Sequence, residues 1–152
     1  MQSPKQRFEE FLAQKKLRLT AQRRAIIETA FGTHQHFTAE QLLKWSRARD
    51  KSISRATVYR TLPLLTESGL MRELDFGKDE KVYDPNYAEH PRHNHLICQD
   101  CGRIFEFESA EIETLQDVIC HRMGFSPQVR RLKIVVQCDE FHRCGSCKNK
   151  KD

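Results

Sequence analysis

Cysteines are the residues whose spacing points most directly to chemistry, and they are Cys98, Cys101, Cys120, Cys138, Cys144 and Cys147. Cys98 and Cys101 form one Cys-x-x-Cys pair, with Gly102 directly after it, and Cys144 and Cys147 form another. Such a pair at a turn lets two thiolates face one ion, and two separate groups of this kind are typical of a four-thiolate structural zinc site. Local spacing favours Cys144 with Cys147 as the second pair, and Cys138 is the alternative.

A second group of metal-capable side chains stands around the first cysteine pair. His93 and His95 alternate in an extended segment, so both imidazoles point to the same face. Glu106 and Glu108 share one face of the next apolar run. Imidazole and carboxylate together suit a divalent first-row metal such as iron, manganese, zinc or nickel. Because these ligands are harder Lewis bases than thiolates, we expect two metal sites with different roles, one structural and one exchangeable.

The elements that position these residues are short. The runs 95–98 and 103–108 read as strands joined by a turn, Ser109 caps an amphipathic helix that Gly124 ends, and 130–136 reads as a last strand. Cys120 falls within that helix and is interpreted as a small buried residue. The tail from Cys138 is polar and cysteine-rich. A β–β–α–β unit of this size is near the limit at which metal or a partner chain must help it fold.

The first half of the chain is predicted to be helical. Helices are expected over 6–14, after Thr20, after Thr38, and from Ser54 to a stop at Gly69. Two strands, 70–76 and 81–84, follow, and this order is that of a winged helix–turn–helix domain. Pro63 is expected to kink the fourth helix or end its first part. The segment 85–92 holds two prolines and is interpreted as a hinge.

Composition limits the class of protein. Hydrophobic residues make up 38% and charged residues 31% of the 152 residues, which indicates a globular chain rather than a disordered one. The sequence shows neither an apolar run of membrane-spanning length nor a signal peptide, so we expect a cytoplasmic protein with no membrane partner. A reducing compartment disfavours a disulfide framework for the cysteines. The net charge of +5 permits binding to nucleic acid without proving it.

Three segments, HNHLICQDCGRIFEF (93–107), ISRATVYRTLPLL (53–65) and LRLTAQRRAII (17–27), resemble signature segments of the ferric uptake regulator family. The similarity extends from about residue 8 to 147. It implies an α+β protein with an N-terminal winged helix–turn–helix DNA-binding domain (1–84), a hinge (85–92) and a small α/β dimerisation and metal-binding domain (93–152). It also implies a homodimer that binds a double-stranded DNA operator as a transcriptional repressor.

The resemblance assigns further residues. It implies that a regulatory metal is held by His36, Asp84, His93, His95 and Glu106. His36 and Asp84 follow from the resemblance alone, because each would otherwise be an ordinary loop residue. For the structural Zn2+ it implies Cys98, Cys101, Cys138 and Cys147, in place of the Cys144 that local spacing favours.

A second metal site found in some relatives matches positions that hold Arg92, Asn94, Glu113 and Arg130 here, and we expect no metal there. That arrangement resembles the peroxide-responsive branch of the family. However, Glu106 stands where that branch has the shorter aspartate, so we place iron sensing ahead of peroxide sensing. Fe2+ is therefore the expected regulatory metal, with Mn2+ or Zn2+ as alternatives.

The helix 55–68 is the expected recognition helix. Tyr59 and Arg60 are candidates for reading bases, since arginine suits guanine edges and tyrosine can pack on thymine methyl groups. Ser54 and Thr57 could bind phosphates at the start of the helix. Arg18 resembles the basic residue that enters the minor groove in this family. Val58 and Leu62, in contrast, are expected in the core.

Three other functions compete with this assignment. A metalloenzyme is disfavoured because the sequence shows neither an HExxH nor a nucleophile motif, and no small-molecule substrate is expected. A zinc-ribbon interaction module does not explain the helix TVYRTL or the basic N-terminus. The serious alternative is a peroxide-, zinc-, manganese- or nickel-responsive member of the same family.

Overall fold

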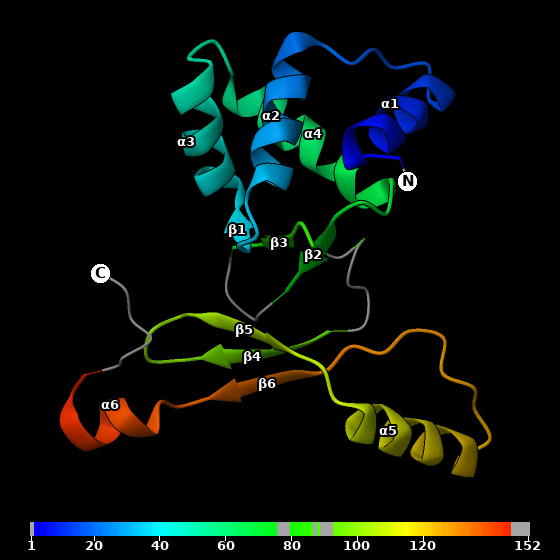
Figure 1. Cartoon of the computed structure of the whole chain (residues 1–152), viewed down its shortest axis with the longest axis vertical. Helices are drawn as coiled ribbons and strands as arrows, with labels where there is room; N and C mark the ends of the chain where they lie inside the picture. Colours follow the sequence, from blue (N-terminus) through cyan, green and yellow to red (C-terminus); the bar gives the residue numbers. More distant parts are fainter. Residues whose placement is uncertain (1, 76–79, 87, 89–92, 147–152) are drawn as a thin grey trace. The chain divides into compact units, whose positions relative to one another are not determined.

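The computed structural model describes residues 2–75, 80–86, 88 and 93–146, and it divides into two compact units, Met1–Pro91 and Arg92–Asp152. The N-terminal unit contains α1 (Pro4–Gln14), α2 (Ala21–Gly32), β1 (Phe37–Thr38), α3 (Ala39–Arg49), α4 (Arg55–Glu67), β2 (Arg72–Leu74) and β3 (Val82–Asp84) (Figure 1). The C-terminal unit contains β4 (Asn94–Cys98), β5 (Ile104–Phe107), α5 (Ala110–Arg122), β6 (Lys133–Val136) and α6 (Asp139–Cys144). The chain is therefore an α+β protein.

Polar caps fix where the N-terminal helices begin. Thr20, Thr38 and Ser54 each accept a hydrogen bond from the backbone N–H three residues later, at the starts of α2, α3 and α4. Gln41 completes a capping box with Thr38. Gly69 follows α4 with a φ of 72°, a left-handed conformation that favours glycine. These four helix starts and stops confirm the predicted boundaries.

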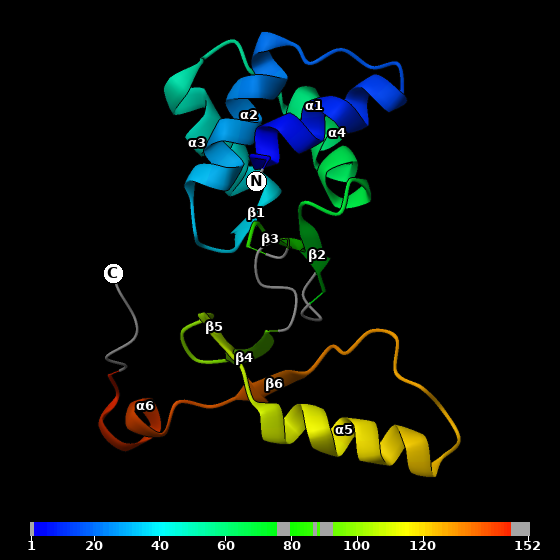
Figure 2. The ribbon, with the colours of Figure 1, turned by 45° about the vertical axis from the view of Figure 1, so that its right-hand side comes forward.

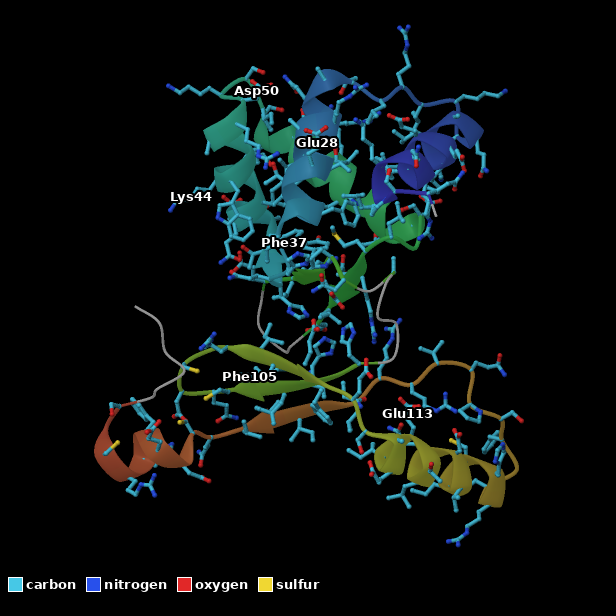
Figure 3. The ribbon with its side chains drawn as sticks, in the orientation of Figure 1. Glu28, Phe37, Lys44, Asp50, Phe105 and Glu113 are labelled. Atoms are coloured by element: carbon cyan, nitrogen blue, oxygen red, sulfur yellow. The ribbon has the colours of Figure 1, made fainter. Side chains whose placement is uncertain are left out.

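The core of the N-terminal unit lies between its helices and a small antiparallel sheet of order β1-β3-β2. Ile26, Leu42 and Leu65, from three different helices, are 0% exposed. Phe37 of β1, labelled in Figure 3, joins them. Its ring packs against Trp45 and Tyr83, whose ring centroids are 6.0 and 6.2 Å away. The two-residue strand β1 was not predicted, and it anchors the sheet to the helices.

Proline 63 does not end α4, which continues to Glu67. The predicted interruption is therefore wrong in that respect. Pro63 removes one backbone N–H from the helix, but the residues on either side are held by the core, where Val58, Leu62 and Leu65 are 0–1% exposed. Burial of this apolar face outweighs the lost hydrogen bond.

The C-terminal unit has a mixed sheet of order β5-β4-β6, in which β4 pairs antiparallel with β5 and parallel with β6. The parallel pairing requires a crossover, which α5 supplies. Ser109 caps α5, and Gly124 follows it with a φ of 85°. Both ribbon views show α5 running away from the sheet of its own unit (Figure 2). The short helix α6 in the polar tail was not predicted.

Candidate metal-binding residues and DNA-binding face

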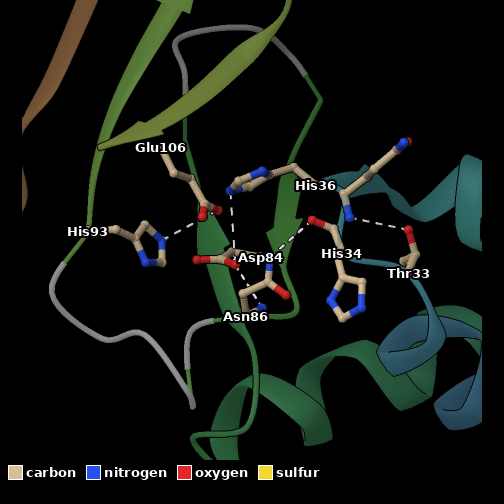
Figure 4. A network of polar contacts seen from close by, with 8 residues as sticks. Thr33, His34, His36, Asp84, Asn86, His93 and Glu106 are labelled. Carbon is tan, nitrogen blue, oxygen red and sulfur yellow. Dashed lines mark hydrogen bonds and ion pairs between the residues drawn. The ribbon is translucent and has the colours of Figure 1, made fainter. Parts of the chain in front are cut away.

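In the N-terminal unit, β1 and β3 bring His36 and Asp84 together. The strands pair Phe37 with Tyr83, so His36 and Asp84 meet at the next position along the ladder. His36 Nε2 lies 3.9 Å from Asp84 Oδ1, and the Asp84 side chain is fully buried (Figure 4). The backbone N–H of Asn86 donates to Asp84 Oδ1 at 2.9 Å, and its side-chain amide donates to the carbonyl of His34. The pair is therefore held in place from both strands.

In the C-terminal unit, β4 and β5 assemble a second group. His95 is paired directly with Glu106, and His93 lies two residues earlier on the same face of β4. His93 Nε2 is 3.7 Å from Glu106 Oε1, and the His93 and His95 rings are 4.8 Å apart (Figure 4). One ligand atom from each of the three residues lies within 4.8 Å of the others. Both histidines are buried.

The donor set of each group fits a divalent cation. A carboxylate with no exposure, such as Asp84, is costly to bury unless a positive charge compensates it. Imidazole and carboxylate ligands bind first-row divalent metals in proteins, and the second imidazole nitrogen stays free to bond a neighbouring group. All five residues expected from the family resemblance thus lie in a pair and a triad, one in each unit.

The cysteine region is joined by a contact that the sequence did not suggest. Cys98 on β4 lies beside Val136 on β6, which brings the first thiol pair to the same end of the sheet as Cys138. The Asp100 carboxylate, inside the Cys98–Cys101 turn, accepts a hydrogen bond of 2.6 Å from the Cys138 N–H. The same carboxylate lies 3.1 Å from His142 Nε2. These two contacts connect the Cys98–Cys101 turn to the start of α6, and no pattern in the sequence pointed to them.

The remaining cysteines differ in their surroundings. Cys138 Sγ accepts a hydrogen bond from the Phe141 N–H and so caps α6. The exposed Cys144 thiol donates instead to the Glu140 carbonyl, 3.0 Å away on the preceding turn. Cys147 lies outside the described residues, so its predicted role as a zinc ligand stays a prediction. Cys120 is only partly buried rather than fully so.

The positions that match the family's second metal site carry a positive charge. Arg130 donates from Nε to Asp117 Oδ1 at 2.9 Å, and its pKa is raised mainly by this hydrogen bond. Glu113 adds to the same effect through its charge. Arg92 lies outside the described residues. A guanidinium thus interacts with both carboxylates here, and the expectation that this position holds no metal stays a prediction.

An apolar surface covers much of the C-terminal unit. No residue of α5 or β6 is buried. Among the described residues of this unit, the exposed large apolar side chains are Leu115, Val118, Ile119, Met123, Phe125, Val129, Ile134 and Val135. Leu115, Val118 and Ile119 repeat at helical spacing and form one stripe on α5. A stripe of this kind on a monomer marks a protein–protein interface.

The N-terminal unit presents a basic hollow beside α4. The hollow is lined by Arg18, Thr20, Ala21, Gln22, Arg23, Thr57 and Arg60. On α4 itself, Tyr59 and Arg60 are exposed, whereas Val58 and Leu62 are buried as predicted. Ser54 and Thr57 use their hydroxyls in the helix cap, where their oxygens are 2.9 Å apart and Thr57 donates to Gln22 Oε1. Of the residues predicted to contact DNA, Arg18, Thr57 and Arg60 thus line one hollow, and the role of all five stays a prediction.

Comparison with known proteins decides the family. The model of the ferric uptake regulator family matches residues 14–135. The chain belongs to the ferric uptake regulator family. It is 35% identical over 148 residues to the ferric uptake regulation protein of Campylobacter jejuni, covering 96% of this chain and 89% of that protein. It is also 33% identical over 131 residues to the peroxide operon regulator of Bacillus subtilis, covering 86% and 88%.

Solved structures of ferric uptake regulators share this fold. The Helicobacter pylori ferric uptake regulator, described as having three functional metal binding sites, matches with a TM-score of 0.81 and 25% identity, covering 97% of each chain. A zinc-bound manganese uptake regulator matches with a TM-score of 0.67 and 34% identity, covering 86% of this chain and 98% of that one. The two matches cover 97% and 86% of this chain, so each includes residues of both units.

Membership settles the class of function. Ferric uptake regulator proteins are metal-responsive transcriptional regulators that bind DNA operators as dimers, and they are not enzymes. The metalloenzyme alternative is thereby set aside. No described helix combines the length and apolar character that crossing a bilayer requires. The relatives include both iron and peroxide regulators, so the family does not by itself select the signal.

Proposed function

We propose that this protein is a cytoplasmic, iron-responsive repressor of metal uptake genes, in which one Fe2+ ion is held jointly by His36, Asp84, His93, His95 and Glu106. The observation that carries the proposal is the division of these ligands between the two units. His36 and Asp84 form a pair in one unit, and His93, His95 and Glu106 form a triad in the other. The triad supplies three protein ligands, and sharing the ion with the pair would bring the number to five.

Sharing one ion between the groups would make the arrangement of the units depend on metal. In a dimer, that arrangement sets the distance between the two copies of α4, and operator half-sites about one helical turn apart require a particular distance. The ion favours the DNA-binding arrangement only by as much as it binds that arrangement more tightly than the others. The protein's residues thereby couple metal supply to repression.

The expected DNA contacts are made by α4, its N-cap and Arg18. Tyr59 and Arg60 read bases, Ser54 and Thr57 contact phosphates, and Arg18 enters the minor groove. Clustering of arginines beside α4 supports this assignment. Arg60→Ala should lower discrimination between duplexes by about 1–3 kcal/mol if the guanidinium reads a guanine edge.

For the structural Zn2+ we propose the ligands Cys98, Cys101, Cys138 and Cys147. The Asp100 hydrogen bond to Cys138 supports Cys138, because it ties that residue to the first thiol pair. Cys144 instead bonds within its own helix. Zinc content measured in Cys138→Ser and Cys144→Ser variants tests the choice: zinc should be lost from the first variant and kept by the second.

The test of the proposed function is DNA affinity measured against a series of divalent metals. The duplex is selected from a random pool by the wild-type protein, and Fe2+ (without oxygen), Mn2+, Zn2+ and Ni2+ are titrated separately. Metal should raise affinity strongly in the wild type, and a His93→Ala, His95→Ala variant should lose that dependence. Metal-independent binding by the wild type would contradict the proposal.

Peroxide sensing is the second candidate, because the peroxide operon regulator of Bacillus subtilis is a relative at 33% identity. The two candidates differ in a simple experiment. A peroxide sensor loaded with Fe2+ releases DNA after brief exposure to hydrogen peroxide, and the Mn2+-loaded form does not. Retention of DNA by both forms favours the iron-responsive assignment.

A further inference from the structure

A carboxylate contacts Tyr59, one of the residues proposed to read bases. Glu40, in the first turn of α3, accepts a hydrogen bond of 2.9 Å from the Tyr59 hydroxyl. Arg55 Nη1 pairs with the same Glu40 oxygen. All three side chains are exposed, with Glu40 at 43%, Arg55 at 61% and Tyr59 at 47%. The negative charge of Glu40 repels phosphate, so by charge alone it would weaken DNA binding at Tyr59 and Arg55.

The position of Glu40 is set by the start of α3. Thr38 and Gln41 form a capping box there, with a 2.8 Å hydrogen bond from the Thr38 N–H to Gln41 Oε1. The N-terminus of a helix carries a partial positive charge, which stabilises a carboxylate in the first turn. Arg55 and Tyr59 are four residues apart on α4 and therefore lie on one side of that helix. One fixed carboxylate can hold both.

We propose that Glu40 is a positioning and specificity-determining residue: it orders Tyr59 and Arg55 for base reading and weakens indiscriminate attraction to phosphates. This inference rests on the proposed DNA-binding face. Non-specific affinity for DNA comes almost entirely from positive charge, whereas specificity comes from ordered contacts with base edges. The ion pair of Glu40 with Arg55 lowers the non-specific affinity. The hydrogen bond of Glu40 with Tyr59 orders that side chain and so supports specificity.

The hydrogen bond also changes an observable property of Tyr59. Donation to Glu40 raises the pKa of the Tyr59 hydroxyl above its usual value of 10.0, and the charge of Glu40 adds to the rise. Replacement of Glu40 by alanine removes both causes. The titration of Tyr59 therefore reports on the contact independently of DNA binding.

The experiment compares Glu40→Ala and Glu40→Gln with wild type. Affinity is measured in Mn2+ for a duplex selected by the wild-type protein from a random pool and for a scrambled duplex of the same composition. Glu28→Gln is the matched control, because Glu28 lies on α2 and pairs with Lys5 at 3.6 Å (Figure 3). Tyr59 titration is followed by ultraviolet absorbance, with Tyr59→Phe identifying its signal.

We expect Glu40→Ala to bind the scrambled duplex roughly threefold more tightly, since a repelling charge is lost. The ratio of selected to scrambled affinity should fall about tenfold, because base-reading side chains lose their order. Glu40→Gln keeps an acceptor for the Tyr59 hydroxyl, so it should gain non-specific affinity and lose less discrimination. The pKa of Tyr59 should fall in Glu40→Ala.

An unchanged affinity ratio in Glu40→Ala, or an equal change in Glu28→Gln, overturns the inference. Arg60→Ala separates this failure from that of the proposed DNA-binding face. If Arg60→Ala weakens binding to the selected duplex and Glu40→Ala leaves the ratio unchanged, only the role of Glu40 is refuted. If Arg60→Ala has no effect on either duplex, the face is wrong and the role of Glu40 falls with it.

Discussion

The apolar stripe on α5 gives a quantitative prediction for the dimer, developed from Leu115. This side chain is 59% exposed in the isolated chain and lies in line with Val118 and Ile119. Complete burial of a leucine stabilises by about 1.5–3 kcal/mol. Burial of the exposed part of Leu115 by the partner subunit thus stabilises the dimer by about 1–2 kcal/mol. Because alanine keeps the β-carbon, Leu115→Ala removes about 1 kcal/mol of this stabilisation per subunit.

A symmetric dimer contains the change twice, so the loss is about 2 kcal/mol. Since 1.4 kcal/mol corresponds to a factor of ten, the dimer dissociation constant should rise about 30-fold. Sedimentation equilibrium over a range of concentrations measures this constant directly. The secondary structure followed by circular dichroism shows whether the variant still folds.

Leu17→Ala is the matched control, because Leu17 is 38% exposed but lies in the N-terminal unit. Its dimer dissociation constant should equal that of the wild type. The reasoning is refuted if Leu115→Ala dimerises as tightly as wild type, or if both variants weaken the dimer equally. Either result would place the dimer contact on another surface.

Three further predictions concern single contacts. Pro63→Ala restores a helix N–H and should raise the free energy of unfolding by about 1–3 kcal/mol in urea denaturation, and an unchanged midpoint would contradict this. Asp100→Ala removes the acceptor for the Cys138 N–H. Hydrogen exchange of that amide should become about 10- to 100-fold faster, as expected for loss of a hydrogen bond to a charged group. An exchange rate equal to that of the wild type would show that this hydrogen bond does not protect the amide. Hydrogen bonds from the Ser52 hydroxyl and N–H lower the pKa of Asp50 below its ordinary value of 3.8. The stability that these bonds add is therefore fully present above pH 3.8 and is lost as the pH falls through the lower pKa of the folded state. In Ser52→Ala the carboxyl pKa measured by NMR should move back toward 3.8, and an unmoved value would assign the shift to another cause.

Local signals predicted most of the fold. Thr20, Thr38, Ser54 and Ser109 each precede an apolar helical pattern, and all four cap a helix. A capping residue and the backbone N–H that it accepts from are only three residues apart, so a short stretch of sequence contains both partners of the interaction. Pro63 misled the prediction because the local rule omits tertiary burial of Val58 and Leu65. The strand β1 and the helix α6 were missed because two and six residues are too few to show a period.

The candidate site was predictable only in part from the residues themselves. His93, His95 and the two cysteines of the first pair stand close together in sequence, so spacing alone indicated metal. His36 and Asp84 are joined only by the pairing of β1 with β3, which no local pattern reveals. Their assignment came from family resemblance. The contacts of Asp100 with Cys138 and of Glu40 with Tyr59 likewise join separate elements, and nothing in the sequence indicated them.

The packing of Phe37 gives this protein a built-in optical probe. Trp45 is the single tryptophan of the chain, and its indole meets the Phe37 ring edge-on. Phe37 directly follows His36 in the chain, so a shift of the histidine is transmitted to the indole's neighbour. We therefore expect the tryptophan emission of the unlabelled protein to change when a metal binds His36 and Asp84, in real time and in the absence of DNA.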